Sequence, residues 1–92
     1  MSEYVVSIET TATGVTLAGP AYVSGFVLTG GSDAASAVIY DHATAASGTI
    51  VATIKVAAAS TNSILFNSPM YVRNGLYMTI TGTAPKAYTY YS

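Results

Sequence analysis

Strand-forming residues dominate this chain of 92 amino acids, and this feature restricts its fold more than any other. Thirty-eight residues are Val, Ile, Thr, Tyr or Phe, the types that suit a pleated, half-buried sheet surface. The strong helix formers Leu, Met, Glu, Lys and Arg supply only twelve residues, and Gln is absent. Alanine-rich patches at 34–37, 43–46 and 57–59 are each too short to form a helix alone. The composition therefore predicts an all-β protein.

Short apolar runs mark the expected strands. Residues 21–29 carry bulky apolar side chains on both faces, which is typical of a central strand, and Gly25 marks a bulge or a close approach of another layer. Residues 37–41 form the next run, which we expect to pair beside 21–29. Residues 49–56 alternate between apolar and polar positions. The residues expected to face inward there are Ile50, Ala52, Ile54 and Val56.

The C-terminal third predicts a hairpin and a closing strand. Asn74-Gly75 favours a type I′ turn between strands at 70–73 and 76–81, and 87–91 follows as the last strand. Further strands are expected at 4–8, 15–17 and 63–67. Seven to nine short strands without a crossover helix predict a single antiparallel β-sandwich, jelly-roll-like in topology. Residues 1–19 are expected to form an N-terminal strand or arm, and residues 20–92 the sandwich.

A domain of 92 residues has a thin stability margin, and most of the usual reinforcements are excluded by composition. The chain has no Cys for a disulfide and only one His, too few ligands for a structural zinc. Charged residues make up 8% of the chain, whereas soluble domains typically carry about 25%. Association with other subunits is therefore the reinforcement that we expect.

Several classes of partner lack a sequence signal. The N-terminal residues Met1 to Glu9 show no basic leader followed by an apolar run, so we expect synthesis in the cytoplasm. No stretch approaches the roughly 18 apolar residues of a membrane span. A formal charge of −1 provides no basic field for phosphates. We therefore expect neither a membrane nor a nucleic-acid partner.

Few residues are available for catalysis or metal binding. Asp41 and His42 could form a triad with Ser32, Ser36 or Ser47, but no Gly-x-Ser-x-Gly elbow is present. Asp33 and Asp41, with carbonyls of Gly30-Gly31, could form a calcium site, although neither belongs to a recognisable calcium loop. The favoured interpretation makes Asp33 a turn residue that caps its own backbone and His42 a surface turn residue. We expect no catalytic residue, no metal and no cofactor.

The eight tyrosines are the strongest indication of a binding surface, because aromatic side chains on sheets serve both sugar stacking and protein contact. Three crowd the last strand, where only Lys86 is nearby to bind sugar hydroxyls. Packing between strands and subunits is therefore favoured over a carbohydrate site. The candidate interface residues are Tyr4, Val6, Ile8, Tyr71, Tyr77, Tyr88, Tyr90 and Tyr91.

Several strand and turn motifs resemble small virion proteins of tailed bacteriophages. They are the run 25–41 (GFVLTGGSDAASAVIYD), Ala46-Ser47-Gly48-Thr49, Asn74-Gly75-Leu76-Tyr77, Thr81-Gly82-Thr83-Ala84-Pro85 and the Tyr-rich last strand. Together they cover residues 22 to 91. The resemblance implies a virion structural component, such as a head decoration or cement protein or a small head-fibre or neck module.

In that interpretation the chain is a capsid decoration protein assembled in the host cytoplasm and located in the virion. Its partners are the major capsid protein or other virion subunits. It forms a homo-oligomer, for which a trimer fits the threefold sites of capsids, and residues 1–19 pair with the sheet edge of a neighbour. The alternative is a receptor- or glycan-binding module of a tail or fibre, with Tyr71, Tyr77, Tyr88 and Tyr90 as stacking residues. A small hydrolase is a distant third.

Overall fold

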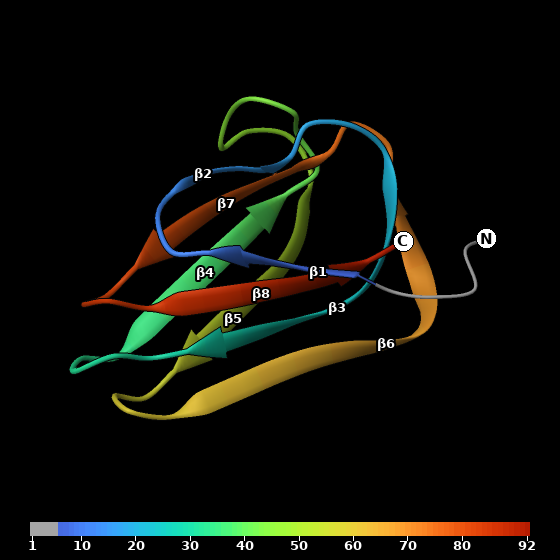
Figure 1. Ribbon diagram of the computed structural model, residues 1–92. Helices are drawn as coiled ribbons and strands as arrows, with labels where there is room; N and C mark the ends of the chain where they lie inside the picture. The colour runs from blue at the N-terminus through green and yellow to red at the C-terminus, as the bar shows by residue number, and fades with distance from the viewer. Residues whose placement is uncertain (1–5) are drawn as a thin grey trace.

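The computed structural model describes residues 6–92, and this part of the chain consists of strands and connections without a helix (Figure 1). The strands are β1 (Val6–Thr10), β2 (Gly14–Leu17), β3 (Ala21–Thr29), β4 (Ala35–Tyr40), β5 (Ile50–Val56), β6 (Thr61–Val72), β7 (Leu76–Thr81) and β8 (Lys86–Tyr91). The all-β prediction is confirmed. Its physical basis is the abundance of residues that favour extended backbone.

The eight strands form two four-stranded antiparallel sheets. The first sheet has the order β1-β8-β3-β6 and the second the order β2-β7-β4-β5. The chain pairs β1 with β8, β2 with β7, β3 with β6 and β4 with β5, so it follows one long hairpin that turns between β4 and β5. Pairing of β3 with β8 and of β4 with β7 rolls this hairpin into a sandwich. This arrangement is a jelly roll, as the sequence predicted.

The core lies between the two sheets, whose strands run at an angle to each other, as β4 and β7 do against β8 and β3 in Figure 1. The largest fully buried side chains are Phe26, Leu28, Ile39, Leu76, Met78, Val23, Val72 and Thr89. Phe26 also meets Phe66 edge to face, with ring centroids 6.1 Å apart. Burying each large apolar side chain contributes about 1.5–3 kcal/mol, so this layer is the main source of stability.

The expected pairing of residues 21–29 with residues 37–41 is wrong. β3 belongs to the first sheet and β4 to the second, so the connection between them crosses the sandwich. Gly31 packs against the carbonyl of Thr83, and Asp33 Oδ2 accepts a hydrogen bond of 2.6 Å from Thr83 Oγ1. The loop thus contacts the β7–β8 connection instead of closing a hairpin.

The expected hairpin around Asn74-Gly75 is also wrong, because β6 and β7 lie in different sheets. A type I′ turn requires positive φ at both central residues, and of this pair only Gly75 has it, at 125°. The corner is held by Asp41, whose carboxylate accepts the backbone N–H groups of Asn74 at 2.8 Å and Arg73 at 3.3 Å. A contact from the end of β4 therefore decides the course of this turn.

The expected inward orientation is correct for Ala52, Ile54 and Val56 of β5 and wrong at the start of the strand. Ile54 and Val56 are buried, whereas Ile50, expected inside, is 55% exposed. The register shifts near the start of the strand, because Ile39 pairs with Ala52 and Tyr40 with Ile50. This bulge reverses the alternation and places Val51 against the core, where an outward residue was predicted.

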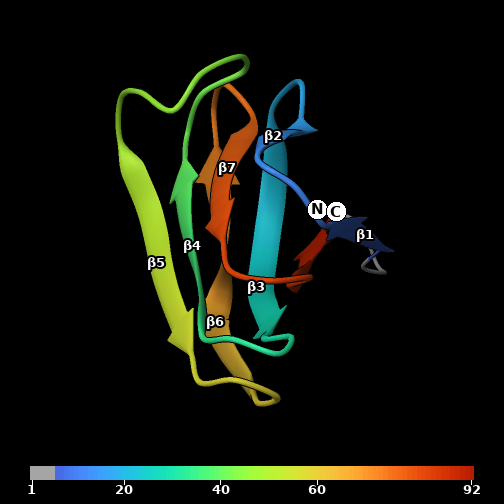
Figure 2. The ribbon, with the colours of Figure 1, turned by 90° about the vertical axis from the view of Figure 1, so that its left-hand side faces the viewer.

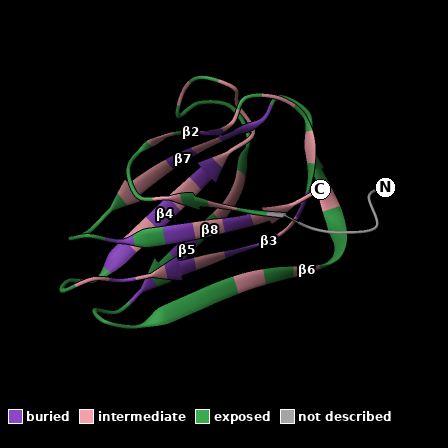
Figure 3. Ribbon diagram, in the orientation of Figure 1, coloured by how far each residue is buried: buried purple, intermediate pink, exposed green. Residues whose placement is uncertain are grey.

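The remaining strands agree largely with expectation. β3 lies between β8 and β6, which confirms the prediction of a central strand at 21–29. The two short strands predicted at 63–67 and 70–73 are one edge strand, β6, most of which is exposed (Figure 3). Residues 6–17 include β1 and β2, which pair with β8 and β7 of the same chain. Pairing of residues 1–19 with a neighbouring subunit stays a prediction.

Candidate functional site

The outer face of the first sheet gathers tyrosines from three strands. Along β8, Ala87 and Thr89 are buried in the core, so Tyr88 and Tyr90 point to the opposite face. Tyr22 of β3 lies across from Tyr71 of β6, with ring centroids 5.2 Å apart and ring planes tilted by 47°. We call this surface the tyrosine face and define it by Tyr22, Val27, Leu65, Tyr71, Tyr88 and Tyr90.

Gly25 leaves a position without a side chain inside the tyrosine face. It lies in register between Tyr90 of β8 and Leu65 of β6, and the ladder is irregular between Val23 and Gly25. Of the two alternatives that the sequence left open at this glycine, the bulge is confirmed. A Cβ at Gly25 would lie 2.6 Å from the carbonyl oxygen of Ile64 and 2.8 Å from Leu65 Cδ2. Only glycine lets β6 lie this close to β3, with Leu65 folded over the gap.

One acidic residue borders the tyrosine face. Glu9 of β1 is the cross-strand neighbour of Tyr88. A side-chain hydrogen bond with Glu9 raises the pKa of Tyr88, and desolvation and the negative charge of Glu9 act in the same direction. Lys86, paired with Thr29, stands at the end of the same sheet. The structure thus adds a carboxylate to a region where the sequence had indicated only Lys86.

The structure brings together only some of the predicted interface residues. Tyr71, Tyr88 and Tyr90 share the tyrosine face, together with Tyr22 and Leu65, which the sequence analysis missed. Leu65 is 73% exposed, the highest value among the exposed large hydrophobic side chains. Sequence alternation could have placed Leu65 outward, since Ile64 and Phe66 face the core, but no local signal reveals that Tyr22 is the neighbour of Tyr71.

The other predicted interface residues lie elsewhere. Tyr91 packs against the hydrophobic core, and Ile8 is paired with the buried Thr89, so both have a place in the sandwich itself. Val6 is the first residue of β1, and Tyr4 lies outside the described residues. Tyr77 belongs to β7 of the second sheet and therefore to the other side of the molecule.

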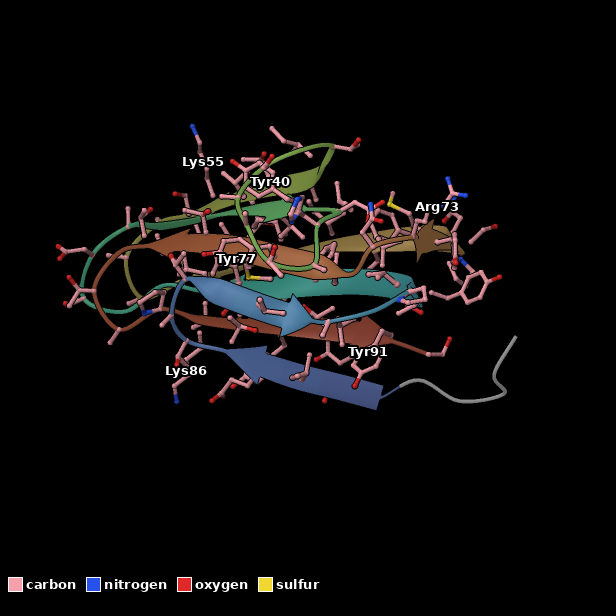
Figure 4. All side chains as sticks on the ribbon, turned by 90° about the horizontal axis from the view of Figure 1, so that it is seen from above. Tyr40, Lys55, Arg73, Tyr77, Lys86 and Tyr91 are labelled. Carbon is pink, nitrogen blue, oxygen red and sulfur yellow. The ribbon has the colours of Figure 1, made fainter. Side chains whose placement is uncertain are left out.

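The outer face of the second sheet carries a smaller apolar row. Tyr77 pairs with Tyr40 of β4 and with Val15 of β2, and Tyr40 pairs in turn with Ile50 of β5. Figure 4 labels Tyr40 and Tyr77 and shows Lys55 and Lys86 projecting on opposite sides of the sandwich. The two sheets thus present two separate outer surfaces, of which the tyrosine face holds more aromatic residues.

A shallow depression of about 510 Å³ lies at the end of the second sheet. Its polar lining consists of Ser36, Lys55 and Thr81. The hydroxyls of Ser36 and Thr81 lie 2.6 Å apart and bond to each other. The depression therefore offers one exposed cation and a hydroxyl pair that is already satisfied, and it is separate from the tyrosine face.

Asp41 and His42 are both bound to backbone groups. The Asp41 carboxylate accepts the N–H groups of Arg73 and Asn74, as described above. His42 Nδ1 accepts the N–H groups of Thr44 at 3.1 Å and Ala45 at 3.0 Å, in the long β4–β5 connection visible in Figure 2. In a triad, Nδ1 would instead donate to the aspartate. This confirms the interpretation of His42 as a turn residue.

The two aspartates of the possible calcium site lie at opposite ends of a strand. Asp33 precedes β4 and Asp41 follows it, so the six residues of this strand, at about 3.3 Å each, separate them. Asp33 was expected to cap its own backbone. Its carboxylate instead accepts a hydrogen bond from the hydroxyl of Thr83. Among residues 6–92, no three His, Cys, Asp or Glu side chains gather in a geometry that could hold a metal ion.

Two further observations complete the description. Within the described part of the chain, no helix is long and apolar enough to cross a membrane. No family model, curated protein or solved structure matches this chain.

Proposed function

We propose that this chain is a non-enzymatic virion structural protein that decorates the capsid and binds the head surface through its tyrosine face. The observation that carries the proposal is the composition of this surface. Tyr22, Tyr71, Tyr88, Tyr90 and Leu65 occupy one side of a rigid sheet, and the exposed fractions of Tyr71 and Leu65 are 53% and 73%. The virion setting comes from the resemblance of the strand and turn motifs to small proteins of tailed bacteriophages.

The physical argument concerns desolvation. Tyr is enriched at the centre of protein interfaces, because its ring buries a large area while its hydroxyl still finds a polar partner. The tyrosine face is rigid, since its side chains stand on paired strands, so little conformational entropy is lost on binding. Among residues 6–92, Glu9 and Lys86 are the two charged residues in the strands of this sheet, so little charge has to be desolvated there. A flat apolar surface of this kind fits another folded protein.

Localisation on virus particles tests the setting. Particles from the native source are labelled with a gold-conjugated antibody raised against the recombinant chain and imaged by electron microscopy. Labelled heads support capsid decoration. Labelled tails or fibres contradict it and favour a receptor-binding module. Unlabelled particles, combined with a negative blot of denatured particles, overturn the virion assignment.

Matched tyrosine variants test the surface. Tyr71→Ala should reduce binding to purified heads by at least about tenfold, the effect of a residue worth 1.4 kcal/mol at an interface. Tyr77→Ala removes the same side chain from the opposite sheet and should leave binding unchanged. Equal effects of the two substitutions contradict docking through the tyrosine face.

Glycan binding is the second candidate, and the position of Glu9 favours it. A carboxylate beside Tyr88 supplies hydrogen bonding, and the tilted ring pair of Tyr22 and Tyr71 supplies aromatic surface on the same face. A glycan array tests this function, with Tyr88→Ala as the variant that should abolish any signal. An array without hits removes the candidate.

A further inference from the structure

The free edge of β6 differs from the other three sheet edges of the sandwich. β6 has 12 residues, of which 61–65 and 70–72 pair with β3 on either side of an irregularity, whereas the edge strands β1, β2 and β5 have 5, 4 and 7. β1 contains Glu9 and β5 contains Lys55, but β6 contains no charged residue. Figure 3 shows most of β6 as exposed. Natural proteins usually protect a long edge with charges or by keeping it short, so this edge is open to pairing with another strand.

The backbone of β6 confirms that hydrogen-bonding groups face outward. The N–H of Gly30 donates to the carbonyl of Ser60 at 2.8 Å, immediately before β6 begins. Bonding alternates along an antiparallel ladder, so the backbone groups of Thr61, Ser63 and Leu65 point away from β3. In agreement, the N–H of Ser63 donates to the side-chain oxygen of Asn62 at 2.9 Å. The outward N–H of Ser63 is thus bound to the side chain of the preceding residue. A strand that pairs with β6 could offer a backbone carbonyl in its place.

We propose that a second copy of this chain pairs with β6 through its own β6, antiparallel and about a twofold axis near Leu65. The two first sheets then form one continuous sheet of eight strands. Leu65, the most exposed large hydrophobic residue in the described part of the chain, lies opposite Leu65 of the second copy and becomes buried. Ile64 then lies opposite Phe66, and Ser63 opposite Asn67, so apolar residues meet apolar residues and polar residues meet polar residues.

The chemistry of β6 identifies a second copy as the occupant. Identical strands meet without like-charge repulsion, because no residue from Thr61 to Val72 is charged. Twofold pairing is isologous and closes at two copies, so it does not propagate into a fibre. Pro69, which lacks an N–H, limits the paired length on one side. The inference does not depend on the virion proposal, although the dimer places two tyrosine faces on the same side of one extended sheet.

The molar mass in solution tests this pairing. Sedimentation velocity over a series of concentrations should give a dimer for the wild-type chain and a monomer for Leu65→Lys, because the lysine would have to be desolvated beside its own symmetry mate. Ile50→Lys places the same charge at an exposed position of the second sheet and should leave the dimer intact. A wild-type monomer at every concentration, a wild-type trimer, or a Leu65→Lys dimer overturns the proposal.

A disulfide across the proposed twofold axis gives a second test, which does not require the lysine variant to fold. The chain has no Cys, so Leu65→Cys carries one thiol, and mild oxidation should convert it to a covalent dimer. Directly opposed residues of an antiparallel pair have Cα atoms about 5.5 Å apart, within the range of a disulfide. The control, Ile50→Cys, should stay a monomer on a denaturing gel. Equal yields of covalent dimer from both variants contradict the pairing.

Discussion

Thr89 places a hydroxyl group in the core, where its Oγ1 has no hydrogen-bond partner among the described residues. The residue is fully buried, between Ile8 of β1 and Phe26 of β3 in the register of the sheet. The other buried threonine, Thr16, is satisfied, because its hydroxyl lies 3.2 Å from that of Thr10. An unpartnered buried hydroxyl lowers stability, since its bonds to water are lost without replacement.

Thr89→Val should therefore stabilise the protein. Valine has nearly the same shape and keeps the strand preference, and removing the unsatisfied hydroxyl should raise the free energy of unfolding by about 1 kcal/mol. Urea denaturation followed by circular dichroism measures the change. The control is Thr53→Val, an exposed position of β5, where the free energy should hardly change. A destabilised Thr89→Val variant would show that the hydroxyl has a partner.

The environment of Gly25 leaves no room for a side chain. Gly25→Ala should lower the free energy of unfolding by about 1–3 kcal/mol, because the new Cβ would overlap the backbone of β6. Gly14→Ala in β2 is the matched control, since nothing lies within 4 Å of a Cβ at that position. Denaturant unfolding of both variants measures the difference, and similar values would argue against the close approach of β3 and β6.

At the scale of elements, hydrogen bonds of two aspartate side chains connect β4 with the connections that follow β6 and β7. Asp41, at the end of β4, binds the connection between β6 and β7, and Asp33, before β4, binds the connection between β7 and β8. Both acidic residues thus have structural roles at opposite ends of the same strand. These contacts explain the two aspartates without a calcium ion.

Asp41→Ala should lower the free energy of unfolding by about 1 kcal/mol, because two backbone N–H groups lose their charged acceptor at a solvent-accessible corner. Asp33→Ala also removes an aspartate side chain but breaks only one hydrogen bond, from the Thr83 hydroxyl. The free energy of unfolding should therefore fall by less than in Asp41→Ala. Thermal or urea unfolding of the two variants provides the comparison. A neutral Asp41→Ala variant would contradict its role in holding the β6–β7 corner.

The pairing of β1 with β8 has a pH-dependent signature. Tyr88 has a raised pKa in the folded protein, chiefly through its hydrogen bond with Glu9. Below about pH 10, the ordinary tyrosine pKa, the phenol is protonated in both the folded and the unfolded state and the bond contributes fully to stability. As the pH rises through the raised pKa of the folded state, the phenolate forms and this contribution is lost.

Glu9→Gln should therefore shift the titration of Tyr88 to lower pH, because the carboxylate that disfavours the phenolate is gone. The ¹³Cζ resonance of Tyr88 in a nuclear magnetic resonance titration measures the shift. Asp33→Asn removes a carboxylate that bonds to a different strand connection and should leave the curve unchanged. An unaltered Tyr88 curve in Glu9→Gln would contradict the register of β1 and β8.

At the scale of the whole molecule, the jelly roll pairs the first described strand with the last. β1 lies beside β8, with Val6 opposite Tyr91, so the first and last strands of the described chain form one ladder. The sandwich also presents two outer surfaces of different composition, the tyrosine face and the row of Val15, Tyr77, Tyr40 and Ile50. One molecule can therefore contact two neighbours on opposite sides.

This topology predicts slow folding. Contacts between distant segments form only after large loops have closed, and closing these loops costs entropy before the contacts add stability. β-Sandwiches accordingly fold in about milliseconds to seconds. Stopped-flow dilution from denaturant, followed by far-ultraviolet circular dichroism or tyrosine fluorescence, measures the rate. Refolding that is complete within microseconds would contradict a fold made from pairs such as β1 with β8.

The sequence by itself determined the local features of this protein. Composition predicted an all-β chain, and alternation correctly placed Ile54 and Val56 of β5 inside. These properties are local, because each depends only on the preference of a residue for extended backbone and on the two-residue period of a strand. Turn residues likewise marked most of the strand ends.

Tertiary structure alone decided which strands are neighbours. The tyrosine face needs Tyr22 beside Tyr71, although the two residues are far apart in the chain, and the free edge of β6 exists only because β6 pairs with β3 alone. The bulge at the start of β5 reversed the side on which Ile50 lies without any change in local pattern. The same turn residues can connect two strands of one sheet or two strands of different sheets, so they do not specify which strands pair. Packing across the whole core decides the partners.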